Sequence, residues 1–359
     1  MNKLQVIRAF FVISIFTIVS CTKNKKEEDP TTEFQKVDLL TNISVNIIVP
    51  EYQQLLNDIL TLESKYIQFS NAKTDPNLEE VKISWKIAYK SWYAVNMYDF
   101  GPAMDIGLKS AIGVYPTDTN KVIANTNSGS YILGSASNSD AIGFSSLDFL
   151  LYRANSLNFF MNSSTYTQYG LDIIQKMKSE VTYVLNNWNS SYLTTFKSST
   201  GTESTSSFSL FVNEFNKTYE LTKNAKLGIP IGKQSLGIIR PEFIEARMSG
   251  ISLDLLKENV IALQRIFNGN SKSGVSGISF DDYLIALDRQ ALATSIDSQF
   301  SSIINDINYL SLTLEQEMVT NPSALDNLYT KMQNLVVSIK TDMASSFGVL
   351  ITYQDNDGD

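Results

Sequence analysis

The sequence contains no histidine among its 359 residues and only one cysteine, Cys21. Without histidine the chain has no Ser-His-Asp triad, no Cys-His dyad, no histidine-ligated haem and no HExxH zinc site. A lone cysteine also excludes an internal disulfide and a multi-cysteine metal centre. Glycine and proline are few, at 17 and 8 residues, which excludes a collagen-like or low-complexity chain.

Positive charge is also in short supply. Lysine and arginine number 29 against 37 acidic residues, which gives a formal net charge of -8. Because such a chain repels phosphate backbones, we expect no nucleic-acid partner. Hydrophobic residues make up 43% of the sequence, and its length allows one large domain or two ordinary ones with a real core.

Residues 1–20 are typical of a secretory signal. Two basic residues precede the apolar run 9–19, which is shorter than the ~20 residues that span a bilayer. Cys21 follows this run after Ser20, as in a bacterial lipobox, so we expect it to be acylated and to anchor the protein to the membrane. The expected location is the outer membrane, on its cell-surface or periplasmic side. The alternative is an ordinary secretory signal with an incidental cysteine.

Residues 21–35 are predicted to form a lipidated flexible tether. The stretch 22–30 is charged and lacks apolar residues, so it has nothing to bury in a core. Its Lys-Lys-Glu-Glu-Asp run, residues 25–29, is similar to acidic surface-export signals of Bacteroidetes lipoproteins. A solvated spacer is the alternative interpretation.

The body of the chain is predicted to be all-α. Apolar residues recur at spacings of three and four, which is typical of amphipathic helices, and alternating strand patterns are scarce. We therefore expect two helical-bundle domains, 36–160 and 161–359, with a boundary near 155–165. The predicted helices cover 50–70, 78–95, 171–188, 253–267, 283–300, 303–318 and 324–346.

Three stretches interrupt the helical pattern. Residues 100–138 are rich in Gly, Ser, Asn and Thr and are too long for a plain connection, so we expect them to be ordered and functional. Residues 190–207 form a Ser/Thr tract and are predicted to be an exposed loop. Residues 228–232, Gly-Ile-Pro-Ile-Gly, predict an irregular loop in the second half.

Several segments, in order, carry a resemblance to a known family. They are Phe100-Gly101-Pro102, Tyr115-Pro116-Thr117-Asp118, residues 141–152, residues 227–259 and the ending 346–359. Together they resemble the imelysin family, which comprises peptidase-like lipoproteins and iron-linked periplasmic proteins of bacteria. The resemblance implies a two-domain helical fold and a role in iron or haem acquisition. An iron or haem ligand and an outer-membrane transporter are the partners it implies.

The chain departs from the family's GxHxxE motif. Gly143 is kept, whereas Ser145 replaces the histidine and Asp148 replaces the glutamate; Asn96 stands where members often carry glutamate. The resemblance makes these residues the binding candidates, with Asp148 as the metal ligand. Because carboxylates suit hard cations, any metal would be one such as iron or calcium. The alternative is a helix start, with Ser145 or Ser146 as N-cap and Asp148 in the first turn.

A second candidate group follows residue 239. Glu242 and Glu245 lie three residues apart after Arg240 and Pro241, which places two carboxylates on one face of a helix or marks an ordinary acidic helix start.

We expect a ligand pocket at the domain junction, since pockets favour such places. Its expected walls are residues 143–148, 100–116 and 228–245. With Asp148, Glu242 and Glu245 nearby, this pocket is expected to favour a cation or a donor-rich ligand.

Three functions compete at this point. The first is a non-enzymatic binding lipoprotein linked to iron or haem. The second is a metallopeptidase, which the family's naming implies, although a zinc peptidase needs three protein ligands and this chain has no histidine. The third is a structural or adhesive surface protein that has lost the site. We expect the first, without catalytic residues.

Overall fold

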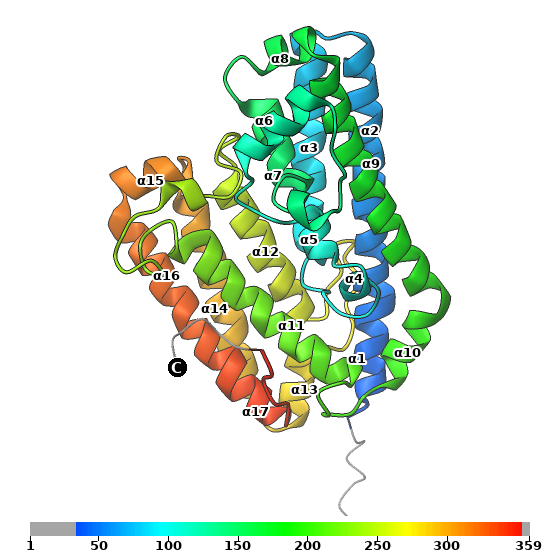
Figure 1. The fold of residues 1–359 in the computed structure, drawn as a ribbon. Helices are drawn as coiled ribbons and strands as arrows, with labels where there is room; N and C mark the ends of the chain where they lie inside the picture. Colours follow the sequence, from blue (N-terminus) through cyan, green and yellow to red (C-terminus); the bar gives the residue numbers. More distant parts are fainter. Residues whose placement is uncertain (1–33, 354–359) are drawn as a thin grey trace, which may run out of the picture. The chain divides into compact units, whose positions relative to one another are not determined.

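A computed structural model of the chain describes residues 34–353 (Figure 1), and from Gln35 onward the described residues form one compact unit. Within the described part there is no β-strand, and extended pairing is limited to one bridge between Asn270 and Ser276. The all-α prediction is confirmed. None of the described helices combines the length and apolar character that a bilayer crossing requires. The predicted signal, Cys21 and most of the tether lie outside the described residues.

The first group of helices packs around one long hairpin. Helix α2 packs along both α3 and α9, and α7 packs against α3 and α9. A π-helical segment, Ile43–Ile48, joins α1 to α2 without a break in the helix. The bounds are α1 (Lys36–Asn42), α2 (Val49–Asn71), α3 (Asp75–Val95), α4 (Pro102–Asp105), α5 (Leu108–Ile112), α6 (Thr119–Ser128), α7 (Gly143–Tyr152), α8 (Ser156–Asn162), α9 (Ser164–Asn187) and α10 (Leu193–Ser198).

The second group of helices encloses an aromatic core. Phe280 contacts the rings of Phe211 and Phe215 with centroids 4.9 and 5.4 Å apart, and helix α14 packs against α12, α13 and α16. The bounds are α11 (Ser207–Leu221), α12 (Ser252–Phe267), α13 (Phe280–Ala286), α14 (Gln290–Tyr309), α15 (Leu314–Thr320), α16 (Pro322–Val336) and α17 (Ala344–Ser346).

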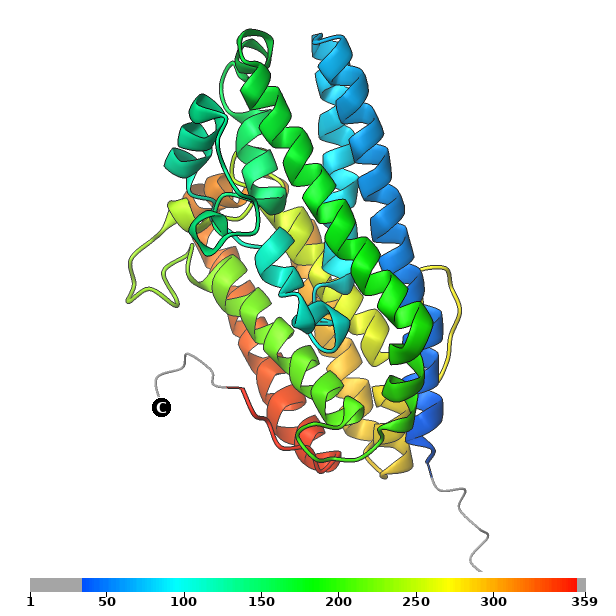
Figure 2. The same ribbon diagram turned by 45° about the vertical axis from the view of Figure 1, so that its right-hand side comes forward.

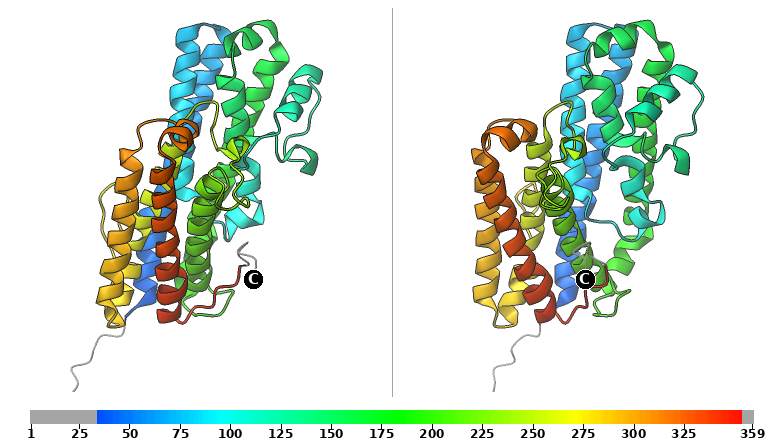
Figure 3. Two further views of the ribbon diagram at one scale, coloured as in Figure 1. Left: turned by 90° about the vertical axis from the view of Figure 1, so that its left-hand side faces the viewer. Right: turned by 60° about the vertical axis from the view of Figure 1, so that its left-hand side comes forward.

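The two groups meet along α3, α11 and α12. Helix α12 packs against α3 on one side and α14 on the other, and α10 packs against α1 and α11. Figures 1 and 2 show α11 and α12 between the α14–α16 pair and the long helices α2 and α9, and Figure 3 shows the same arrangement from the side of α14 and α16. This seam brings residues of both groups together.

The predicted boundary near residues 155–165 falls inside the first group. Helix α9 follows that boundary in the sequence, yet it packs along α2. The change from one group to the other comes later, between α10 and α11. The division into two domains, 36–160 and 161–359, stays a prediction.

Some predicted helices differ from those observed. The predicted helix 283–300 is divided at Asp288, whose φ of +58° a helix does not allow. The predicted helix 303–318 is divided between α14 and α15, where Thr313 and Gln316 form a capping box. Helix α11 was not predicted, and α10 occupies part of the tract predicted to be a loop because Phe196 is buried there.

Candidate functional site

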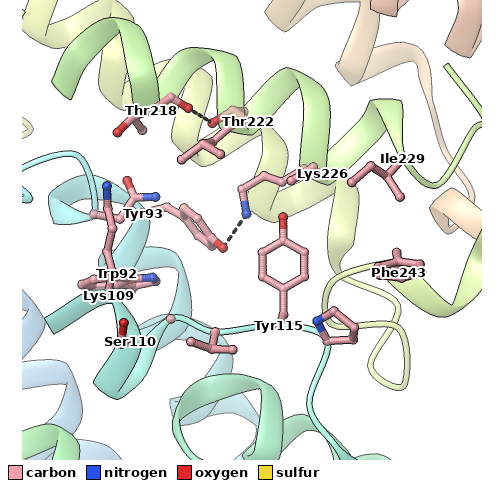
Figure 4. A pocket seen from close by; sticks show the side chains of 16 residues that line it. Trp92, Tyr93, Lys109, Ser110, Tyr115, Thr218, Thr222, Lys226, Ile229 and Phe243 are labelled. Atoms are coloured by element: carbon pink, nitrogen blue, oxygen red, sulfur yellow. Dashed lines mark hydrogen bonds between the residues drawn. The ribbon is translucent and has the colours of Figure 1, made fainter. Parts of the chain in front are cut away.

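A pocket of about 450 Å³ lies at the seam between the two helix groups (Figure 4). Helices α3 and α5 and the loop after α5 form one wall. Helix α11 and its π-helical continuation η4 (Thr222–Gly228) form the other. The lining residues are Trp92, Tyr93, Asn96, Lys109, Ser110, Gly113, Val114, Tyr115, Pro116, Thr218, Leu221, Thr222, Ala225, Lys226, Ile229 and Phe243.

A buried polar cluster adjoins this pocket, and two of its members, Tyr93 on α3 and Lys226 on η4, belong to the lining. Glu245 accepts hydrogen bonds from the hydroxyls of Tyr89, at 2.6 Å, and Tyr93. The ammonium group of Lys226 forms an ion pair with the same carboxylate and also donates to the Tyr93 hydroxyl. The side chains of Lys226 and Glu245 are 6% and 0% exposed, so this pair is withdrawn from water. Charge and hydrogen bonds are both satisfied, as burial of such groups requires.

Burial shifts the titration of this cluster. It raises the pKa values of Tyr89 and Tyr93 well above their usual range, and the neighbouring Glu245 carboxylate raises them further. Burial lowers the pKa of Lys226, and Glu245 opposes that change. The Lys226 ammonium lies 3.9 Å from the centroid of the Tyr93 ring and 4.9 Å from that of Tyr115, which adds cation–π attraction. Tyr89 and Tyr93 therefore stay neutral hydrogen-bond donors beside the Lys226 ammonium group.

Asp148 holds the turn that follows Glu245. Its two carboxylate oxygens accept the backbone N–H groups of Met248 and Ser249, each at 3.0 Å. Asp148 is buried, and burial raises its pKa to about 6 even though these hydrogen bonds lower it. The residue thus ties α7 of the first group to the turn that carries Glu245. This is a positioning role.

Gly143 begins α7 in a conformation that glycine favours, with φ of +77°. A Cβ atom at this position would lie 2.5 Å from the carbonyl oxygen of Ile112, at the end of α5. Directly after it, Phe144 stacks on Tyr89 with ring centroids 4.6 Å apart. Glycine therefore allows the close approach that seats α7 behind the polar cluster.

The predicted site residues fall into three places. Asn96 lines the pocket, and its buried side-chain oxygen has no hydrogen-bond partner among the described residues. Glu245 and Asp148 are both buried and do not line the pocket. Glu245 belongs to the polar cluster, and Asp148 holds the neighbouring turn. Arg240 and Glu242 form an exposed ion pair at 2.5 Å, and neither residue lines the pocket.

The helix-start interpretation of the motif is wrong. Helix α7 begins at Gly143 with Ile142 as N-cap and no side-chain cap, and its first turn holds no acid. Ser145 is buried, and Ser146 shares a hydrogen bond of 2.6 Å with Thr117. Glu245 likewise lies beyond the single turn Pro241–Phe243.

The expected walls of the pocket are correct in two parts out of three. The 100–116 and 228–245 segments line it, whereas residues 143–148 lie behind the lining and α11 with η4 takes their place. The expected preference for cations loses its basis, because the charged lining residues are Lys109 and Lys226 and no carboxylate lines this pocket among the described residues.

The carboxylates also do not fit a bare metal ion. Both carboxylate oxygens of Asp148 accept hydrogen bonds from backbone N–H groups, and the Glu245 carboxylate is surrounded by two hydroxyls and an ammonium group. In the described part of the chain, no three side chains of the types His, Cys, Asp and Glu come together as a metal site. Asp148 is therefore not free to act as a metal ligand.

Sequence reasoning missed Tyr93, Lys226 and Tyr115. Lys226 continues the buried stripe of α11, which runs through Phe215, Tyr219 and Thr222 at spacings of three and four. A lysine on such a stripe needs a buried partner, and this signal was available in the sequence.

Comparison with known proteins gives the same fold. A family model described as Imelysin matches residues 48–343. A putative iron-regulated protein A precursor from Parabacteroides distasonis ATCC 8503 has a TM-score of 0.75 at 15% identity, covering 87% of this chain and 95% of that one. An imelysin-like protein from Psychrobacter arcticum 273-4 has a TM-score of 0.69 at 15% identity, covering 88% and 96%.

A curated relative matches over a shorter stretch. Iron-regulated protein A of Synechococcus elongatus is 28% identical over 85 residues, which is 22% of this chain and 24% of that protein. The match thus spans about a quarter of the relative's length. The family match, in contrast, extends from α2 to the end of the π-helical segment after α16. The chain belongs to the imelysin family.

Proposed function

We propose that this protein is a non-enzymatic binding lipoprotein of the bacterial envelope that acts in iron or haem acquisition. The observation that carries this proposal is the 450 Å³ pocket between the two helix groups. Its volume is in the range of small-molecule sites, and its walls are mainly apolar and aromatic with a few fixed polar groups. The buried Lys226–Glu245 pair and its tyrosine donors hold one wall in place before a ligand arrives.

The chemistry of the chain favours binding over peptide hydrolysis. A zinc peptidase needs three protein ligands and an open position for water, and this sequence supplies no histidine. The candidate carboxylates Asp148 and Glu245 are already held by N–H and O–H donors. Binding of an organic molecule in the pocket does not require Asp148 or Glu245 to coordinate a metal.

The link to iron is supported by what similar proteins are called. A structural neighbour and a curated relative each bear the name iron-regulated protein A, and the neighbour is described as a precursor. To test this link, a deletion strain is grown under iron limitation and complemented with the wild type or with Ala225→Trp, which places an indole in the pocket. We expect rescue by the wild type alone. Equal growth of the deletion strain and its parent would contradict the link.

Ligand binding itself is tested on protein purified without a polyhistidine tag, because a tag adds the ligands that the chain lacks. Native mass spectrometry of wild type and Ala225→Trp, both isolated from the same cells, compares the bound mass. We expect a small molecule on the wild type and none on the variant, since Ala225 lines the cavity.

Envelope anchorage is tested at Cys21. Two acyl chains hold a protein to a membrane far more firmly than one, since each buried CH₂ contributes ~0.8 kcal/mol. Cys21→Ala is therefore expected to move the protein from the membrane to the soluble fraction after cell lysis. A membrane-bound variant would show that the lipoprotein prediction is wrong.

A further inference from the structure

The charged groups that line the pocket within residues 34–353 are two ammonium groups, those of Lys109 and Lys226. Lys109 pairs with Asp99 at 3.4 Å and Glu214 at 3.5 Å, and Lys226 pairs with the fully buried Glu245. None of these carboxylates belongs to the lining. A ligand in the pocket therefore meets the positive end of each ion pair.

The neutral polar groups on the same walls add hydrogen-bond donors. Ser110 and Tyr115 both carry hydroxyls in the lining, and Figure 4 shows Tyr115 standing in the cavity beside Lys226. Burial raises the pKa of Tyr115 well above its usual range, so its hydroxyl keeps its proton and can donate it. Donors on both walls select a ligand that carries acceptors.

The rest of the lining is apolar and largely aromatic. Trp92, Tyr115 and Phe243 present ring surfaces from three separate segments, and Val114, Leu221 and Ile229 fill the space around them. Aromatic walls of this kind pack well against flat rings, with stacked or edge-to-face contacts. The body of the ligand is therefore expected to be flat and apolar.

We propose that the pocket binds an aromatic organic acid, whose anionic group lies against Lys109 and Lys226 and whose rings pack between Trp92, Tyr115 and Phe243. This inference rests on the proposed binding function and specifies its ligand class. The anionic group faces the two ammonium groups from the cavity side, because the carboxylates that pair with them do not belong to the lining. Cations and basic ligands are disfavoured by the same two groups.

The test uses two fluorescent probes with the same aromatic body. One is 8-anilinonaphthalene-1-sulfonate, an anion, and the other is N-phenyl-1-naphthylamine, which is uncharged. We expect the wild type to bind the anion roughly tenfold more tightly or better, as hydrogen bonds to charged groups contribute. Lys109→Gln is expected to remove most of that preference and to leave the affinity for the neutral probe unchanged.

A matched control comes from the same ion-pair network. Lys217 contacts Glu214 at 2.9 Å and Asp99 at 3.9 Å, as Lys109 does, but it does not line the pocket. Lys217→Gln removes the same charge from the same partners and is expected to leave both affinities unchanged. Tyr115→Phe keeps the ring and is expected to weaken only the anionic probe.

The outcomes separate this inference from the proposed function. Ala225→Trp is expected to abolish tight binding of both probes, which locates them in the pocket. If Lys109→Gln changes both affinities equally or changes neither, the acid preference is overturned while pocket binding stands. If the wild type binds neither probe at a site that Ala225→Trp blocks, the inference and the proposed pocket function both fail.

Discussion

The Glu245→Gln substitution tests the buried ion pair most directly. The amide keeps the shape of the side chain, and its oxygen still accepts from Tyr89 and Tyr93. Its NH₂ group, however, replaces the oxygen that faces Lys226, and the ammonium group loses its counter-charge. With side-chain exposures of 6% and 0%, water cannot replace that charge, so we expect a loss of about 3–5 kcal/mol in the free energy of unfolding.

The pH dependence of that loss identifies its cause. Burial already lowers the pKa of Lys226 from its usual value of 10.5, and Glu245 opposes the change. In Glu245→Gln the pKa of Lys226 in the folded state falls further below its value in the unfolded chain. The unfolded state then releases its proton only near 10.5, so stability rises as pH increases toward that value. The loss in Glu245→Gln should therefore be larger at neutral pH than at alkaline pH.

The assay is urea unfolding followed by tryptophan fluorescence, since Trp85 and Trp92 lie on α3 beside the cluster. Glu242→Gln is the matched control, because Glu242 lies in an exposed pair with Arg240 and its loss should leave the free energy of unfolding nearly unchanged. Lys226→Met combined with Glu245→Gln should be more stable than Glu245→Gln alone. A Glu245→Gln variant as stable as the control, with no pH dependence, would refute the reasoning.

Two further predictions concern the segment behind the pocket. Gly143→Ala should lower the free energy of unfolding by roughly 2 kcal/mol or more in urea unfolding, since its Cβ would lie 2.5 Å from the Ile112 oxygen. Gly107→Ala, with similar φ but open space around it, should cost about half as much, and equal losses would rule out the steric cause. As pH rises from 4 to 7, Asp148→Asn should become more stable relative to the wild type by about 3 kcal/mol. The reason is that the wild type must ionise a buried carboxyl whose pKa is raised to about 6, which lowers its stability. A difference that stays constant with pH would show that Asp148 does not titrate in this range.

Periodicity alone was sufficient to predict the long helices. The predicted helix 50–70 corresponds to α2 (Val49–Asn71), and 253–267 corresponds to α12 (Ser252–Phe267). Both have a wide apolar stripe and bury it. Breaks such as the one at Asp288 were not predictable in this way, because the apolar spacing continues across them and only the backbone conformation changes.

The site was harder to predict because its residues resemble an ordinary core. Tyr89 and Tyr93 lie on the buried stripe of α3, where an aromatic ring is expected for packing. The position of their hydroxyls becomes informative only when Glu245, more than 150 residues later in the sequence, is placed beside them. A local sequence pattern does not show a contact between residues so far apart in the chain, so the cluster could be identified only from the tertiary structure.

The altered family motif acquires a physical explanation from the same geometry. With Ser145 in place of histidine and Asp148 in place of glutamate, the helix no longer offers a pair of metal ligands. Asp148 instead reaches the backbone N–H groups of Met248 and Ser249, and so fixes the turn that carries Glu245. Glu245 in turn holds Lys226 at the edge of the pocket. The acidic position of the motif is therefore connected to the pocket through two intermediates, Glu245 and Lys226. Substitutions at Asp148 should change stability first, and the affinity for the proposed ligand only through Lys226.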